Sequence, residues 1–170
     1  DRSFEGDTDF LERGGDGIEG LTFVPNSDHR EGGRFFAVNQ FDPPALVELA
    51  LPLRSSRERF EKARIVAAHR IASPPLSDVL WSPELRAFLI PSALWRSVYV
   101  VDEAGARRAS IRVPGIMQEG IALLPEGAVV IAQDTGGLIK WQPSKPPFEA
   151  VAVGSPERVG TSGTQSDEKE

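Results

Sequence analysis

Two short segments of this sequence place a glutamate at the same point of a repeated pattern. The segments are GIEGLTFVP at residues 17–25 and QEGIALLP at residues 118–125, and in both a Glu-Gly pair precedes four strand-forming residues and a proline. Carboxylate oxygens are the ligands that Ca²⁺ prefers in proteins, so Glu19 and Glu119 are the first candidates for chemistry. The competing interpretation is that each glutamate only begins a strand and hydrogen-bonds loop amides.

A third copy of the pattern carries no glutamate. It reads SDVLWSP from Ser77, and Pro83 ends it as Pro25 and Pro125 end the others. A second and a third apolar run follow each copy, and a fourth run is visible, although weakly after the last copy. The interval from one copy to the next equals or somewhat exceeds the roughly 40–50 residues of a four-stranded propeller blade. The sequence therefore predicts an all-β fold, a partial β-propeller of about three four-stranded antiparallel blades. The three expected blades span residues 17–72, 73–114 and 115–154. Apolar side chains of the first run of each copy are expected to pack near the axis or between blades: Leu21, Phe23, Val79, Trp81, Ile121 and Leu123.

The ends of the chain differ from its middle. Residues 1–16 are acidic and glycine-rich, which indicates a remnant or flexible lead-in, and residues 155–170 are polar, which favours a disordered tail. Three blades cannot close a ring of about four to eight. Since the chain also starts at Asp1 rather than Met, we expect either a piece of a longer propeller or a half-ring completed by a second copy. The charged segment at residues 55–66 fits a helix and a loop leading into a strand equally well.

Blade geometry predicts which residues accompany the two glutamates. The start of the innermost strand lies beside the end of the antiparallel second strand, so one face of the blades should collect oxygen-bearing side chains. The metal-ligand candidates are Glu19, Glu119, Asn39 and Asp134. The ligand-contact candidates on the same face are Gln40, Gln133, Trp95 and Arg96. Oxygen ligands without Cys or His favour a hard cation, Ca²⁺ above all.

Other polar residues in these segments receive structural interpretations. Ser77 stands where the other copies carry glutamate, and we expect it to be structural. Asp42, Asp78 and Asp102 are interpreted as turn residues. The glycines that follow Glu19 and Glu119 are expected to fit a crowded axis where a side chain would obstruct its neighbour.

The composition excludes several classes of function. A formal net charge of −6 and a pI near 5.1 argue against a surface for nucleic acid or anionic membrane. The absence of cysteine excludes disulfides, thiolate metal sites and a cysteine nucleophile. No apolar run approaches the roughly 18 residues of a membrane span. GDGIEG matches the dinucleotide fingerprint by letter, but a strand ending in proline follows it instead of a helix, so no such cofactor is expected.

The repeated segments also resemble a known family. GIEGLTFVPNSDHREGGRFFAVNQFDPPALVELAL, PLSDVLWSPELRAFLIPSALWRSVYVVDEAG and MQEGIALLPEGAVVIAQDTGGLIKW resemble blades of the SdiA-regulated proteins, extracytoplasmic β-propellers of Gram-negative bacteria. The resemblance covers about residues 17–141. It implies a six-bladed ring, often tethered to the membrane by an N-terminal segment, and a location in the periplasm. The Glu-Gly segments are also similar to those of phytase-like and esterase-like propellers, in which channel acids hold Ca²⁺.

Two functions remain open at this point. The first is a non-catalytic propeller module that binds Ca²⁺ and a ligand or partner at the channel mouth, with further blades or a second copy completing it. The second is a metal-dependent hydrolase of phosphate or carboxylic esters. A phosphoesterase needs cationic groups beside its metal, and the loops on the candidate face clearly offer only Arg96, which favours the binding module. No catalytic residue is assigned.

Overall fold

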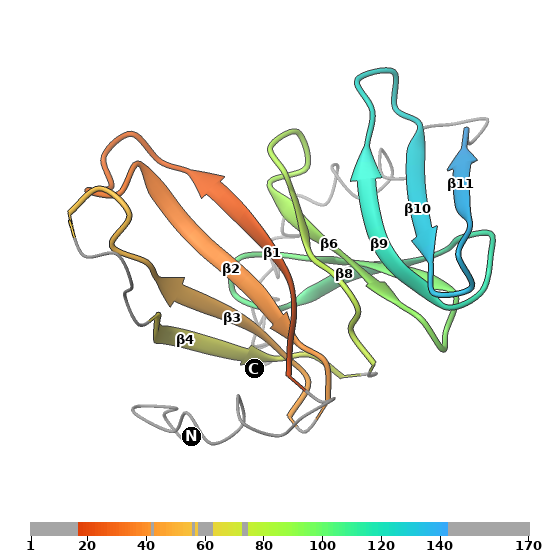
Figure 1. The fold of residues 1–170 in the computed structure, drawn as a ribbon, viewed down its shortest axis with the longest axis horizontal. Helices are drawn as coiled ribbons and strands as arrows, with labels where there is room; N and C mark the ends of the chain where they lie inside the picture. Colours follow the sequence, from red (N-terminus) through yellow and green to blue (C-terminus); the bar gives the residue numbers. More distant parts are fainter. Residues whose placement is uncertain (1–16, 42, 56, 58–62, 73–74, 143–170) are drawn as a thin grey trace, which may run out of the picture.

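The described part of the chain consists of strands in three antiparallel sheets. The computed structural model describes residues 17–41, 43–55, 57, 63–72 and 75–142. These residues form eleven strands and no helix, and hence none that could span a membrane. Each copy of the repeat forms one sheet in which consecutive strands pair as neighbours (Figure 1). The prediction of an all-β fold with antiparallel sheets is confirmed.

The strands follow one another in spatial order within each sheet. The first sheet contains β1 (Ile18–Pro25), β2 (Gly33–Asn39), β3 (Ala45–Ala50) and β4 (Arg64–Arg70). The second contains β5 (Leu80–Ser82), β6 (Ala87–Ser92), β7 (Ser97–Val101) and β8 (Arg107–Arg112). The third contains β9 (Gln118–Leu123), β10 (Val129–Gln133) and β11 (Leu138–Trp141).

Some expectations fall partly or wholly outside the described residues. The fourth strand of the third blade, the lead-in and the polar tail lie outside them, as do Asp42 and residues 56 and 58–62. The charged segment at residues 55–66 is expected to be either a helix or a loop that leads into a strand. Its end is a strand, since Arg64 and Val66 belong to β4.

A short polar turn connects β7 to β8. Between β7 and β8, the Asp102 carboxylate accepts hydrogen bonds from the backbone nitrogens of Ala104 (3.0 Å) and Ala106 (2.9 Å). Gly105 completes this turn with a φ of 80°, a value that favours glycine. Asp102 is therefore a turn residue, as expected.

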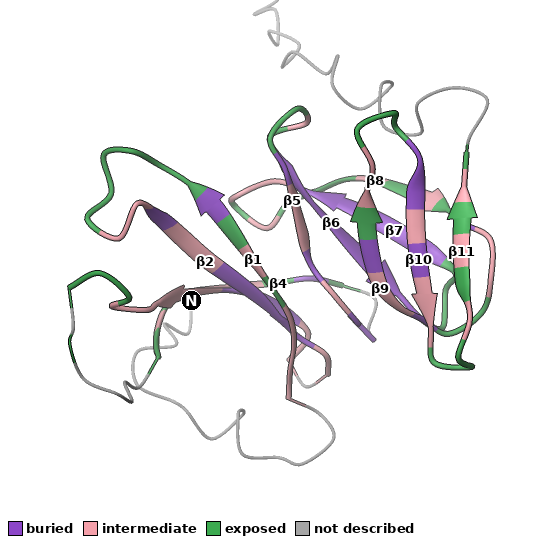
Figure 2. Cartoon of the chain, turned by 45° about the horizontal axis from the view of Figure 1, so that its top comes forward, coloured by how far each residue is buried: buried purple, intermediate pink, exposed green. Residues whose placement is uncertain are grey.

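The second sheet lies between the other two. Every residue of β6 and β7 is buried (Figure 2). Side chains alternate across a strand, so Phe88 and Ile90 join the core shared with the first sheet, while Leu89 joins the core shared with the third. A sheet covered on both faces needs apolar residues at consecutive positions, which explains the runs AFLIPS and SVYVV.

Equivalent positions on the first strand of each repeat face in the same direction along this stack. They are Leu21 and Phe23, Val79 and Trp81, and Ile121 and Leu123. The last four pack against the preceding sheet, as the sequence predicts. For Leu21 and Phe23 the same prediction is wrong, because they are 56% and 37% exposed. No described strand lies on that side of the first sheet.

Candidate functional site

The three sheets meet at one end, where β1 and β9 begin and β2, β6 and β10 end. We call this end the junction; it comprises residues 17–20, 39–40, 76–78, 91–92, 117–121 and 133–134. Gln40 donates its backbone N–H to the Gly17 carbonyl (3.1 Å) and accepts from the Leu76 nitrogen (3.3 Å). The same residue therefore joins β1 to β2 and the first sheet to the segment that enters the second.

Ser77 joins the second sheet to the third. Its backbone nitrogen donates to the Pro91 carbonyl (3.1 Å), beside the end of β6. Its hydroxyl donates to the Gln118 carbonyl at 2.5 Å, at the start of β9. Ser77 is buried, and both contacts are to backbone, so it has the structural role expected from its sequence.

Asp78 makes a second link between the same sheets. One carboxylate oxygen accepts from the backbone nitrogen of Val79 (2.8 Å) and the other from that of Ile121 (2.9 Å) in β9. Burial raises the pKa of this carboxyl, and the two backbone donors oppose that rise. The interpretation of Asp78 as a turn residue is wrong, because its carboxylate accepts from a strand of another sheet.

The position of Asp78 explains the glycine of the first Glu-Gly pair. Asp78 occupies in the second repeat the place that Gly20 and Gly120 hold in the others. A Cβ added to Gly20 would lie 2.7 Å from the Val79 nitrogen and 2.8 Å from the Asp78 Cα, closer than van der Waals contact allows. Gly20 also has a φ of 64°. At Gly120 an added Cβ would lie 3.3 Å from the Ala132 Cβ and 3.8 Å from an Asp78 oxygen, so the constraint there is weaker.

The two glutamates of the repeated pattern interact at the junction. Burial raises the pKa of Glu119, and the negative charges of Asp134 and Glu19 raise it further. Asp134 is exposed and lies beside the start of β9, because its backbone nitrogen donates to the Met117 carbonyl (3.0 Å). Asp134 and Glu19, which belong to two different sheets, are thus near enough for their charges to act on the Glu119 carboxyl.

Asn39 and Gln133 face the loops of their own sheets. Asn39 is fully buried, and its Nδ2 donates to the carbonyls of Phe41 (2.7 Å) and Pro43 (2.9 Å) in the loop after β2. The Gln133 side chain accepts from the backbone nitrogen of Ile116 (2.8 Å), in the connection that leads to β9. Both amides therefore order backbone around the junction.

Three buried side-chain oxygens at this end have no hydrogen-bond partner within the described residues: Asn39 Oδ1, Ser92 Oγ and Gln118 Oε1. Gln118 also donates from Nε2 to the Pro114 carbonyl (3.1 Å). Gln118 is not among the site residues predicted from the sequence. The signal that could have found it is its place directly before the second Glu-Gly pair.

Trp95 and Arg96 lie in the turn between β6 and β7. Both are exposed, and Arg96 has a φ of 49°. Their carbonyls accept from the Ser97 hydroxyl and the Val113 nitrogen, each at 3.0 Å. The charges that raise the pKa of Glu119 are those of Asp134 and Glu19.

The described carboxylates do not by themselves complete a metal site. Among the described residues, no three acidic, histidine or cysteine side chains are grouped so that they could hold a metal ion. Ca²⁺ takes about six to eight oxygen ligands, which include backbone, amide and water oxygens. Any cation at the junction would therefore depend on such neutral oxygens as well as on the glutamates.

The sequence matches no model of a known protein family and no curated protein. The resemblance to SdiA-regulated propellers thus stays a prediction.

Proposed function

We propose that this chain is a non-catalytic binding module, built from consecutive β-propeller blades of the SdiA-regulated type, that binds Ca²⁺ and a ligand or partner at the junction. The stack of sheets supports the blade interpretation, because each sheet is a meander whose first strand starts at the same end. The exposed apolar face at Leu21 and Phe23 supports a further blade or a second copy on that side. The extracytoplasmic location rests on the family resemblance alone.

The feature that carries the proposal is the convergence of acidic side chains at the junction, where Asp134 and Glu19 lie near the Glu119 carboxyl. Burial and the charges of Asp134 and Glu19 all disfavour the ionised form of this carboxyl. Since the native pKa lies above the unfolded one, the ionised carboxyl costs stability in the folded protein at neutral pH. A bound cation would remove this repulsion, and binding would then stabilise the native state.

Neutral oxygens at the junction favour a metal cation as the bound positive charge over a cationic side chain of a partner protein. Asn39 Oδ1 and Gln118 Oε1 are buried acceptors for which the described residues provide no donor. Such atoms are costly to leave unpaired, and a rotation that turns one of them toward a cation or its water ligands would satisfy it. The remaining coordination positions would be open to a ligand or partner, which gives the metal a role in recognition.

The alternative of a metal-dependent ester hydrolase is less well supported. Transferring or hydrolysing a phosphate ester requires cationic groups near the metal. The charges acting on Glu119 are negative, and Arg96 makes its described contacts through its backbone. We therefore assign no catalytic residue.

The test is calcium binding by the protein and by one double variant. We expect calorimetric titration to show Ca²⁺ binding, and 100-fold excess over Kd to stabilise the protein by about 2.7 kcal/mol, or roughly 5–10 °C in Tm. Glu19→Gln combined with Glu119→Gln should abolish both effects, because it removes the charges and keeps the shapes.

Glu84→Gln is the matched control, since Glu84 is exposed in the turn between β5 and β6, at the other end of the second sheet. The control should bind Ca²⁺ as the parent does. Absence of binding by the parent, or unchanged binding by the double variant, would show that the glutamates only begin strands.

A further inference from the structure

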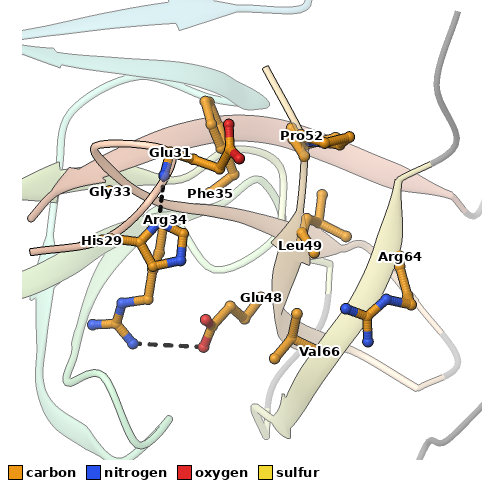
Figure 3. Close-up of a pocket in the computed structure, with 12 residues that line it drawn as sticks. His29, Glu31, Gly33, Arg34, Phe35, Glu48, Leu49, Pro52, Arg64 and Val66 are labelled. Atoms are coloured by element: carbon orange, nitrogen blue, oxygen red, sulfur yellow. Dashed lines mark hydrogen bonds and ion pairs between the residues drawn. The ribbon is translucent and has the colours of Figure 1, made fainter. Parts of the chain in front are cut away.

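A pocket lies at the end of the first sheet opposite the junction, where β2 begins, β3 ends and β4 begins. Its volume is about 370 Å³, near the lower limit of the roughly 300–1,000 Å³ typical of ligand pockets. Charged and apolar side chains share its lining. The residues that matter here are Arg34, Glu48, Leu49, Pro52, Arg64 and Val66 (Figure 3).

Two loops are tied together at the rim of this pocket. The backbone nitrogen of Arg54 donates to a Glu31 carboxylate oxygen at 2.6 Å, which joins the loop after β3 to the loop after β1. Hydrogen bonds from the Ser55 side chain and the Arg54 backbone lower the pKa of Glu31, so this carboxylate stays ionised at neutral pH. The Arg54 guanidinium lies over Gly32, where an added Cβ would be 2.6 Å from it. The rim is therefore formed before any ligand binds.

The charges of Arg34 and Glu48 are already paired. The Arg34 guanidinium forms ion pairs with Glu48 (3.5 Å) and with Glu103 of the second sheet. It also lies over the Phe36 ring, 5.3 Å from the centroid. Glu48 consequently repels an incoming anion only weakly, and Arg34 is held in place without a ligand.

Arg64 is in a different position. It is exposed, lines the pocket, and makes no ion pair or side-chain hydrogen bond with any described residue. Figure 3 shows its guanidinium across the pocket from that of Arg34, with Glu48 and Val66 between them. Val66 is 52% exposed, and Leu49 and Pro52 add apolar surface beside it.

We propose that this pocket binds a small amphipathic carboxylate. The guanidinium of Arg64 would hold the carboxylate, because its planar donors match the two oxygens. The apolar part of the ligand would cover Val66 and lie against Leu49 and Pro52, which removes apolar surface from water. This site is separate from the junction, and its occupancy does not depend on calcium.

The test is an NMR titration of the protein with octanoate, octylammonium and inorganic phosphate as separate probes. Octanoate should shift the backbone amide signals of Leu49, Leu51 and Val66. Arg64→Gln should weaken octanoate binding about tenfold or more, since it removes a charge-assisted hydrogen bond. Arg70→Gln should leave it unchanged, because Arg70 is an exposed arginine of the same strand outside the pocket.

The other outcomes overturn the proposal. Equal binding of octylammonium would mean that apolar contact alone drives binding and that Arg64 has no role. Phosphate producing the same shifts as octanoate would mean that the apolar surface contributes nothing. A lack of any octanoate shift at these amides, or equal weakening by Arg70→Gln, would show that the pocket is not a carboxylate site.

Discussion

Replacing Gly20 by alanine tests whether the glycine of the repeated Glu-Gly pair is there because of Asp78. Two costs add in this variant. Alanine at a φ of 64° costs about 1–2 kcal/mol relative to glycine. The added Cβ would also lie 2.7 Å from the Val79 nitrogen and 2.8 Å from the Asp78 Cα, so backbone of the neighbouring sheet must move, at about 1–3 kcal/mol for an overpacked site.

The expected loss of stability is therefore about 2–5 kcal/mol, or roughly 4–20 °C in Tm for a chain of this size. Gly127→Ala is the matched control, because Gly127 has a φ of 81° and no atom within 4 Å of an added Cβ. It carries the conformational cost alone. The entropy that alanine removes from the unfolded chain is the same in both variants and cancels in their difference.

The assay is urea denaturation of both variants, followed by circular dichroism. Gly20→Ala should be less stable than Gly127→Ala by about 1–3 kcal/mol, the steric part of the cost. Gly20→Ala should cost less in an Asp78→Gly background than in the parent, because the side chain that approaches Gly20 is then gone while the backbone contact remains; the loss of the hydrogen bonds that Asp78 accepts is common to both arms of this double-mutant cycle and cancels. Equal stability of the two single variants would refute the close approach of the sheets at the junction.

Two further predictions concern charges. The pKa of Glu119 is raised in the folded protein, so this residue binds more protons in the native than in the unfolded state. Its contribution to the free energy of unfolding should therefore grow as the pH falls from 7 toward the unfolded pKa near 4.5. Glu119→Gln should therefore stabilise the protein at pH 7 and reduce the gain in stability between pH 7 and pH 5. Midpoints of urea denaturation at the two pH values measure both effects. If the pH dependence of stability is the same in the variant and the parent, the Glu119 carboxyl is not repelled. Arg34→Gln should cost about 1–2 kcal/mol by the same denaturation assay, since it removes a partly buried link between the first and second sheets. Lys140→Gln, which breaks only an exposed pair with Glu126, should cost less than about 1 kcal/mol, and equal effects would contradict a special role for Arg34.

The strands and their grouping could be predicted from the sequence because both depend on local patterns. Alternation of apolar residues, β-branched composition and turn residues such as Asp102 act over a few neighbours in the chain. The repeat then assigned one sheet to each copy. The pairing of the start of one strand with the end of the next, as for Ile18 and Asn39, follows from antiparallel geometry alone.

The candidate site could be predicted only in part. The shared register of Glu19 and Glu119 indicated that they belong to the same end of the fold, and their charges do act on each other. The inward turn of Asn39 toward its own loop could not be inferred, because a buried amide can hydrogen-bond in several directions with similar energy.

Tertiary structure alone decided which surfaces meet. A strand pattern says that Leu21 and Val79 face the same way, but only the packing of the sheets buries Val79 and leaves Leu21 exposed. The partners of Asp78 are likewise in another sheet, and the pocket at Arg64 joins loops that are distant in the chain. The composition and order of residues determined strands, turns and repeat, whereas contacts between sheets depend on long-range packing, which local periodicity does not encode.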